Sequence, residues 1–269
     1  MVSHAAMQNI NRMIIKGANV MRNVYLDYSA TTPVKEEVLK EMLPYFTEKF
    51  GNPSSLYDTG LEAKAAVTHA REQVAALIHA DPKEVFFTAG GTESDNWALF
   101  GACDKLKEKG NHIITTKIEH HAILHSCAFL EKHGFDVTYV GIDKDGRVNL
   151  KELEDAITDK TILISVMMVN NESGTVQPIR EIAKIAKAHK ILFHIDAVQA
   201  LGNVPIDVKD MGIDLMSMSS HKIYGPKGEG ALYIRKGVRI SNYLHGGAQE
   251  VGVGHAGNFH GILERQEEA

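Results

Sequence analysis

The chain has 269 residues, 44% of them hydrophobic, and a formal net charge of -5. This length and composition are enough to bury a large core. The acidic balance provides no positive field for a polyanion, which excludes nucleic acid as an expected ligand. No apolar run approaches the length of a bilayer span, so we expect no membrane partner. The two cysteines are too few for a disulfide scaffold and lack metal-ligand spacing, which predicts no metal site and favours a reducing, cytoplasmic location.

The N-terminal part of the chain predicts an extension followed by two helices. Residues 1–23 lack a continuous apolar segment, so we expect a loose extension and no signal peptide. Residues 24–27 are predicted to form a short strand, after which Pro33 opens a helix that runs to about residue 49. A glycine and proline break at 50–55 leads to a second helix, predicted over 61–78.

The next strand, predicted at 84–88, runs directly into a glycine turn and a helix. The exposed N–H groups and the positive dipole end of such a helix attract phosphate, and Thr92 adds a hydroxyl. Gly91 and Thr92 are therefore candidate phosphate ligands. An ordinary strand-to-helix connection with an N-cap has the same pattern and stays open as the alternative.

Apolar strands and helices alternate through the rest of the chain. Strands are predicted at 112–116, 137–142, 161–169 and 191–196, and helices at 121–133, 150–157 and 179–188. Almost wholly apolar strands that alternate with helices predict an α/β fold with a mostly parallel sheet and helices on both faces. Ligands of such sheets bind outside the carboxyl ends of the strands, which is where the polar clusters of this sequence fall.

One of these clusters places Lys222 among hydroxyls and an imidazole, after an apolar run and before a Gly-Pro turn. A lysine in a crowded polar site can lose its proton and become the nucleophile of a Schiff base, although a surface lysine beside a turn is the plain alternative. Asp196 ends the preceding strand. Pyridoxal phosphate requires an acid against its ring nitrogen and an amine at its aldehyde, and Asp196 and Lys222 could provide these two groups. Residues 230–235 are expected to return as an antiparallel strand, because only a tight turn precedes them.

Seven motifs occur in order along the chain, at 26–33, 50–54, 91–96, 119–120, 169–172, 194–199 and 219–228. Together they resemble the cysteine desulfurases of the NifS/IscS type, which are pyridoxal 5'-phosphate enzymes of fold type I in the class V aminotransferase group. The resemblance implies a cofactor-binding large domain at 24–250, between the extension 1–23 and a divergent tail at 251–269.

The resemblance also implies roles for individual residues. Lys222 would carry the cofactor, Asp196 would pair with the protonated ring nitrogen, and His120 would stack on the ring and move protons. The remaining contacts would come from Gln199 at the ring hydroxyl, from Asn171 near that hydroxyl and the substrate carboxylate, and from Thr92, Ser219 and His221 at the phosphate.

The implied reaction converts L-cysteine to L-alanine and leaves the sulfur as a persulfide on a cysteine of the enzyme. The implied partners are a second copy of the chain in a homodimer and a sulfur-acceptor protein, such as an iron-sulfur scaffold or a tRNA thiolation factor. A selenocysteine lyase, another class V aminotransferase relative and a non-catalytic fragment stay as alternatives. A nicotinamide dehydrogenase ranks last, since no Gly-x-Gly-x-x-Gly follows the first strand.

The family continues into a small C-terminal domain whose loop carries the nucleophilic cysteine, whereas this chain stops at Ala269. We therefore expect that domain and loop to be missing, and the loss of match after Glu250 suggests a frameshift or a truncated gene. Cys103 and Cys127 both fall on predicted helices, so we interpret them as core residues and not as the nucleophile. The chain by itself is expected to bind the cofactor weakly or not at all and to make no sulfide from cysteine.

Overall fold

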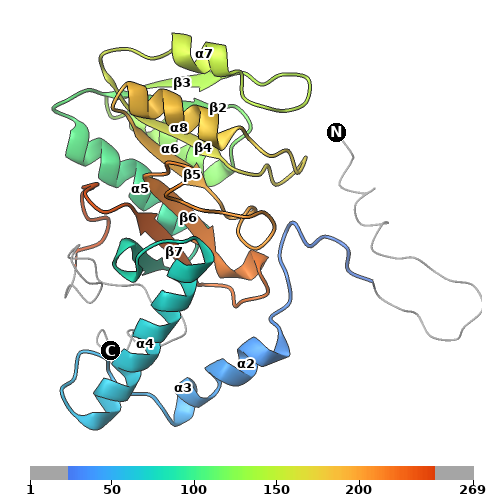
Figure 1. The fold of residues 1–269 in the computed structure, drawn as a ribbon, viewed down its shortest axis with the longest axis vertical. Helices are drawn as coiled ribbons and strands as arrows, with labels where there is room; N and C mark the ends of the chain where they lie inside the picture. Colours follow the sequence, from blue (N-terminus) through green and yellow to red (C-terminus); the bar gives the residue numbers. More distant parts are fainter. Residues whose placement is uncertain (1–23, 246–269) are drawn as a thin grey trace, which may run out of the picture.

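The computed structural model describes residues 24–245, so the predicted extension 1–23 and tail 251–269 lie outside the described residues. A seven-stranded sheet of order β1-β7-β6-β5-β4-β2-β3 forms the centre (Figure 1). The strands are β1 Val85–Thr88, β2 His112–Thr116, β3 Asp136–Val140, β4 Thr161–Met167, β5 Leu192–Asp196, β6 Leu215–Ser219 and β7 Gly230–Ile234. Strands β3, β2, β4, β5 and β6 pair in parallel, whereas β7 is antiparallel to β6 and β1. The predicted mostly parallel sheet and the antiparallel final strand are thus confirmed.

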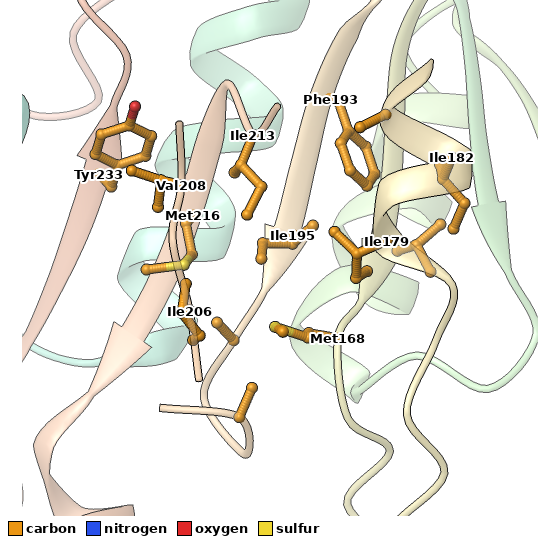
Figure 2. Close-up of a cluster of buried hydrophobic side chains, with 14 of the residues drawn as sticks. Met168, Ile179, Ile182, Phe193, Ile195, Ile206, Val208, Ile213, Met216 and Tyr233 are labelled. Carbon is orange, nitrogen blue, oxygen red and sulfur yellow. The ribbon is translucent and has the colours of Figure 1, made fainter. Parts of the chain in front are cut away.

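Helices cover both faces of the sheet, as predicted. They are α2 Glu36–Met42, α3 Pro44–Thr47, α4 Asp58–Leu77, α5 Gly91–Leu106, α6 His121–Glu131, α7 Leu150–Asp155 and α8 Ile179–Ala188, with 3-10 turns η1 Pro82–Glu84 and η2 Ser220–Lys222. Ile182 of α8 belongs to one hydrophobic core together with Phe193 and Ile195 of β5 (Figure 2). Trp97 of α5 and Cys127 of α6 belong to a separate core on the other face. The two cores are separated by the sheet itself.

Most strands between these layers are buried along nearly their whole length, whereas the edge strand β3 is partly exposed. Every residue of β4, β6 and β7 is buried, and all but the first residue of β5 is buried. Side chains alternate between the two faces of a strand, so a strand covered on both sides has no solvent-facing positions. Both faces of these strands are therefore buried, including the polar residues His194 and Ser217.

Two predictions near the N-terminus are wrong. Residues 24–27 form no strand, and the helix predicted from Pro33 to about residue 49 is two short helices, α2 and α3. Pro44 explains the break, because its ring cannot continue a preceding helix and its missing N–H suits the first position of the next one. The start moves to Glu36 because the N–H of Lys35 donates to the carbonyl of Tyr224, which holds Lys35 in an extended conformation.

The second helix begins earlier than predicted. Helix α4 starts at Asp58, three residues before the predicted 61, and ends at Leu77. Its first turn contains Gly60, where an added Cβ would lie 2.5 Å from the carbonyl oxygen of Ser55. Close packing of the 50–55 break against this turn therefore sets the helix start. No helix within residues 24–245 is long and apolar enough to span a membrane.

Candidate active site

A cavity of about 760 Å³ opens at the edge of the sheet where β4, β5 and β6 end. Its size lies within the range of small-molecule sites. All nine residues that the sequence predicted for the site line it, namely Gly91, Thr92, His120, Asn171, Asp196, Gln199, Ser219, His221 and Lys222. These residues come from five separate segments of the chain, which meet because parallel strands bring their carboxyl ends to one edge.

The lysine turn directly follows β6. Strand β6 ends at Ser219, and Lys222 closes the 3-10 turn η2. The N–H of Gly225 donates to the carbonyl of Ser220 over 3.0 Å, and a Cβ on Gly225 would come within 2.8 Å of the Ser220 Cβ. Only glycine therefore fits at position 225. The turn holds Lys222 at the mouth of the cavity.

The N-terminal segment fixes this turn from the other side. Buried Thr32 donates its N–H and its hydroxyl to the carbonyl of His221, each over 2.9 Å. The same hydroxyl accepts the N–H of Tyr224 over 2.8 Å, which holds Tyr224 in a left-handed conformation with φ 66°. Left-handed backbone is unfavourable for a bulky residue, so neighbouring contacts must hold it. Thr32, which lies after the segment predicted to be a strand, thus fixes the lysine turn.

Lys222 is half-buried, and its Nζ donates to the main-chain carbonyls of Ser29 and Ala30. Burial lowers the pKa of this amine below its usual value, while the charges of Asp27 and Asp196 raise it. The net direction is downward. A lowered pKa increases the fraction of unprotonated amine near neutral pH, and the unprotonated amine is the nucleophilic form.

Asp196 supplies the acid of the cavity. It is the last residue of β5 and is 5% exposed, and its Oδ1 accepts the N–H of Val198 over 2.9 Å. Burial raises the pKa of this carboxyl, whereas the Val198 hydrogen bond, His120 and Lys222 lower it. The acid and the amine therefore line one cavity and act on each other's charge.

The turn between β1 and α5 contributes Gly91 and Thr92. Gly90 adopts φ 144° and ψ -177°, a conformation that only glycine reaches easily, and α5 begins at the next residue. A Cβ on Gly91 would lie 2.6 Å from Cγ2 of Val198, so only glycine lets this helix start approach the strand end so closely. Gly91 and Thr92 also line an adjoining hollow together with Ser219 and His221. The four predicted phosphate ligands thus share one corner of the site.

His120 combines a local role with its place in the cavity. It is the N-cap of α6, and its Nδ1 accepts the N–H of Ala122 over 3.1 Å. An Nδ1 that accepts a hydrogen bond leaves the proton of the neutral ring on Nε2. The ordinary helix-start role of this histidine is therefore real, and the ring still lines the cavity.

The two amide side chains are positioned by loops. Buried Asn170 accepts the N–H groups of Glu172 and Ser173 on its Oδ1 and donates from Nδ2 to the carbonyl of Ile118. These bonds shape the loop after β4 and bring Asn171 to the cavity. Gln199 lies one turn beyond Asp196 and donates from Nε2 to the carbonyl of Ser29 over 2.8 Å.

Glu119, to which the sequence assigned no role, directly precedes the cavity-lining His120. It is 6% exposed, and its two carboxylate oxygens accept the Thr116 hydroxyl over 2.6 Å and the Met167 N–H over 2.9 Å. It thereby joins the ends of β2 and β4, whose regular pairing stops at Ile114. Burial raises the pKa of Glu119 to about 8. Its position next to His120 in one motif was the only signal in the sequence.

Two further acids were missed. Asp95 of α5 lines the cavity and is 1% exposed, although an acid on a helix normally faces water. Asp214, which had no assigned role, bonds the N–H of Phe193 over 3.0 Å and Nε of Arg235 over 2.7 Å, and so ties β5 to the end of β7.

The cysteines were correctly interpreted as core residues. Cys103 and Cys127 are 1% and 0% exposed, and neither lines the cavity. Burial raises the pKa of each thiol to about 12, so both are protonated and unreactive at neutral pH. Within residues 24–245, no group of three or more His, Cys, Asp or Glu side chains is arranged to hold a metal ion.

Comparison with known proteins identifies the family. The model of the family described as Aminotransferase class-V matches residues 24–265, which extends past Glu250, where the motif resemblance was expected to end. A cysteine desulfurase IscS of Clostridium botulinum (strain Kyoto / Type A2) is 62% identical over 231 residues, and one of Methanosarcina thermophila is 58% identical over 238 residues. These alignments cover 86% and 87% of this chain, which spans only 58% and 59% of the two relatives.

Solved structures agree with these relatives. A protein described as NifS-like superposes with a TM-score of 0.84 at 44% identity, over 87% of this chain and 64% of that one. A protein described as SspA in complex with cysteine gives a TM-score of 0.84 at 45% identity, over 87% of this chain and 67% of that one. The chain therefore belongs to the class V aminotransferase family, among the enzymes of the cysteine desulfurase NifS/IscS type.

Proposed function

We propose that the cavity binds pyridoxal 5'-phosphate and that the chain supplies the cofactor-binding part of a cysteine desulfurase. The observation that carries this proposal is the pairing of Lys222 and Asp196 in one cavity, with each acting on the charge of the other. A nucleophilic amine and a buried acid are the two groups that this cofactor requires from a protein. The donor set therefore fits the cofactor.

Each predicted residue has a chemical task in this proposal. The cofactor, when bound, supplies an electron-withdrawing ring that delocalises negative charge from the amino-acid substrate. Lys222 provides the amine that attaches the cofactor. Asp196 holds a proton at the ring nitrogen, and His120 holds or moves a proton at its Nε2. Asn171 and Gln199 orient the ring and the substrate by hydrogen bonds.

The phosphate is assigned to the corner formed by Gly91, Thr92, Ser219 and His221. The opening N–H groups of α5 have no partners within the helix and carry the positive end of its dipole, so they favour an anion. His221 has a pKa lowered by burial and by the charges of Lys222 and Lys227. A bound phosphate would reverse this electrostatic cost, because an anion favours the protonated imidazole.

The substrate is proposed to be L-cysteine, which the solved relative described as being in complex with cysteine supports. The overall reaction converts L-cysteine and a thiol to L-alanine and a persulfide, so that one C–S bond breaks and one S–S bond forms. The thiol is neither Cys103 nor Cys127, because both are buried away from the cavity in protonated form. The acceptor protein, the homodimer and the cytoplasmic location stay predictions.

Reductive trapping tests the cofactor assignment. The purified chain is mixed with excess pyridoxal phosphate, reduced with borohydride, digested and mapped by mass spectrometry. We expect the pyridoxyl mass on the peptide that contains Lys222, and its loss in Lys222→Ala. Lys109→Ala, which changes an exposed lysine, is the matched control and keeps the label at Lys222. Of the two outcomes expected for the chain by itself, weak binding or none, the proposal requires weak binding. Because reduction captures even a small bound fraction, absence of label at Lys222 contradicts the proposal.

A further inference from the structure

A second carboxyl lies beside the acid of the cavity. Asp95 reaches it from α5 and is 1% exposed. Its Oδ1 has no hydrogen-bond partner among the described residues, whereas its carboxyl is hydrogen-bonded to the Ser217 hydroxyl. A buried carboxylate that lacks full hydrogen bonding is costly, so a carboxyl in this place favours its neutral form.

Asp95 packs on a polar band that crosses the three central strands. Ser165 of β4 is in register with His194 of β5, and Ser217 of β6 is in register with Asp196. The His194 ring makes two hydrogen bonds within this band. Its Nδ1 lies 2.9 Å from the Ser165 hydroxyl, and its Nε2 lies 3.0 Å from the Ser217 hydroxyl. Asp95 therefore contacts the face of β5 that carries both His194 and Asp196.

His194 does not neutralise Asp95 by an ion pair. The distance from its Nε2 to Oδ1 of Asp95 is 3.8 Å, longer than a hydrogen bond, and both side chains are fully buried. Burial lowers the pKa of His194 to about 3 and raises that of Asp95 well above its usual value. Both shifts favour neutral groups. The Asp95 carboxyl is thus left to be neutralised by a proton.

Asp95 and Asp196 differ in the charges that surround them. Asp196 is acted on by two cationic or proton-binding groups, Lys222 and His120, and accepts the Val198 N–H. Asp95 is acted on by Asp196 and Glu119, both acids, and by the Ser217 hydroxyl. When two buried carboxyls repel each other, the proton stays on the one with fewer stabilising partners. That carboxyl is Asp95.

We propose that Asp95 is a positioning residue that keeps a proton beside Asp196 and thereby leaves Asp196 as the single anion at the acid end of the cavity. The role of that anion rests on the proposed function, in which Asp196 faces the ring nitrogen of the cofactor. The groups that face Asp95 are His194 and Asp196 from β5, Ser217 from β6 and Glu119 from the turn before α6. Ionisation of Asp95 would place a second negative charge next to Asp196 and change its proton affinity.

Infrared spectroscopy of the full chain without cofactor tests the protonation state. Protonated carboxyls and carboxylates have separate carbonyl bands. At pH 7 we expect Asp95→Asn to lose one protonated-carboxyl band relative to the unchanged chain. The control Asp104→Asn, which changes a 58% exposed acid with a lowered pKa, loses carboxylate absorption instead. Loss of carboxylate absorption in Asp95→Asn would overturn the proposal.

A second variant keeps the proposal testable if Asp95→Asn fails to fold. Removing the charge of its neighbour with Asp196→Asn lowers the pH at which the protonated band of Asp95 disappears, because the repulsion that holds the proton is gone. An unchanged titration of that band would overturn the coupling. A structural role alone would not produce this shift.

The absorption of bound pyridoxal phosphate links Asp95 to the cofactor. For the unchanged chain, we expect this absorption to change at alkaline pH, when Asp95 loses its proton. In Asp95→Asn, we expect that change to be absent. Retention of the change in Asp95→Asn would overturn the positioning role. Failure of trapping at Lys222 with a normal infrared result would overturn the proposed function and leave only the protonated state of Asp95 standing, whereas normal trapping with an ionised Asp95 would overturn only this inference.

Discussion

The two faces of the central sheet carry different side chains, although these alternate along the same strands. On β5, Phe193 and Ile195 face α8 and pack in a hydrophobic core, whereas His194 and Asp196 face α5 and belong to a polar band. Apart from the phenol of Tyr233, the residues of this core carry hydrophobic side chains, so the contribution of this face is mainly burial. On the α5 face, buried polar side chains that can hold protons replace part of the hydrophobic contacts. The comparison suggests that stability and site chemistry are separated by strand alternation.

The largest effect is expected from breaking the apolar face. Phe193→Ala removes a ring that is 1% exposed and should lower the free energy of unfolding by about 3–5 kcal/mol, through lost burial and the cavity left behind. Chemical denaturation measures the change. Phe46→Ala, which changes a 58% exposed ring, is the control and should shift stability by only about 0.5 kcal/mol or less. Similar losses for both variants would show that the α8 face is not a main source of stability.

Breaking the polar face should cost less. Glu119→Ala leaves the buried Met167 N–H without its acceptor, which should destabilise the protein by about 1–3 kcal/mol. Glu119→Gln keeps an acceptor oxygen and should recover part of the loss. Denaturation of both variants at pH 6 provides the test. Equal losses in the two variants would mean that the Glu119 side chain acts through its charge and not through its hydrogen bonds.

The polar face should also make stability depend on pH. Glu119 has a folded pKa of about 8 against 4.5 for the ordinary carboxyl, so the folded state binds the proton more tightly and stability falls as pH rises. His194 has a lowered pKa and so acts in the opposite direction, but only below its ordinary value of 6.5. Between pH 6.5 and 8 we therefore expect Glu119 to lower the free energy of unfolding by at most about 1.4 kcal/mol per pH unit. Denaturation across that window should show a flatter profile for Glu119→Gln, and a steeper one would contradict the assignment.

The smallest effect is expected at the strand ends far from the cavity. Arg235→Met removes the 2.7 Å ion pair between Arg235 and Asp214. The Arg235 side chain is 48% exposed. Solvent screens such a pair, so the loss should be about 1 kcal/mol or less. Raising the salt concentration should reduce the difference between the variant and the unchanged chain. A loss as large as that of Phe193→Ala would remove the distinction between the apolar core and its surroundings.

Much of the fold was predictable because its signals are local. The boundaries of α8 were predicted correctly at 179 and 188, and the ends of β2 at 112 and 116, since apolar period and polar breaks mark them directly. The segment 24–35 was mispredicted because its conformation depends on contacts far along the chain. Thr32 bonds His221 and Tyr224, and no local pattern reveals a partner about 190 residues away.

The site divides in the same way. The nine predicted residues stand at strand ends and helix starts, where polar residues interrupt apolar runs, and each could be found from its motif. Asp95 and Glu119 lie within or beside such motifs. Their burial, and the effect of Glu119 on the pKa of Asp95, could not be predicted from the sequence. Protonation depends on the dielectric surroundings and on neighbouring charges, which exist only once α5 packs on the sheet.

The sequence by itself determined the α/β class, the order of the strands and helices, and the residue types available for the chemistry. These follow from hydrophobic period and from turn residues, which act over a few positions of chain. Only the tertiary structure decided that Thr32 clamps the lysine turn, that Glu119 joins two strand ends and that Asp95 lies beside Asp196. The reason is physical: hydrogen bonds and pKa values depend on distances and burial, and folding sets both between residues far apart in the chain.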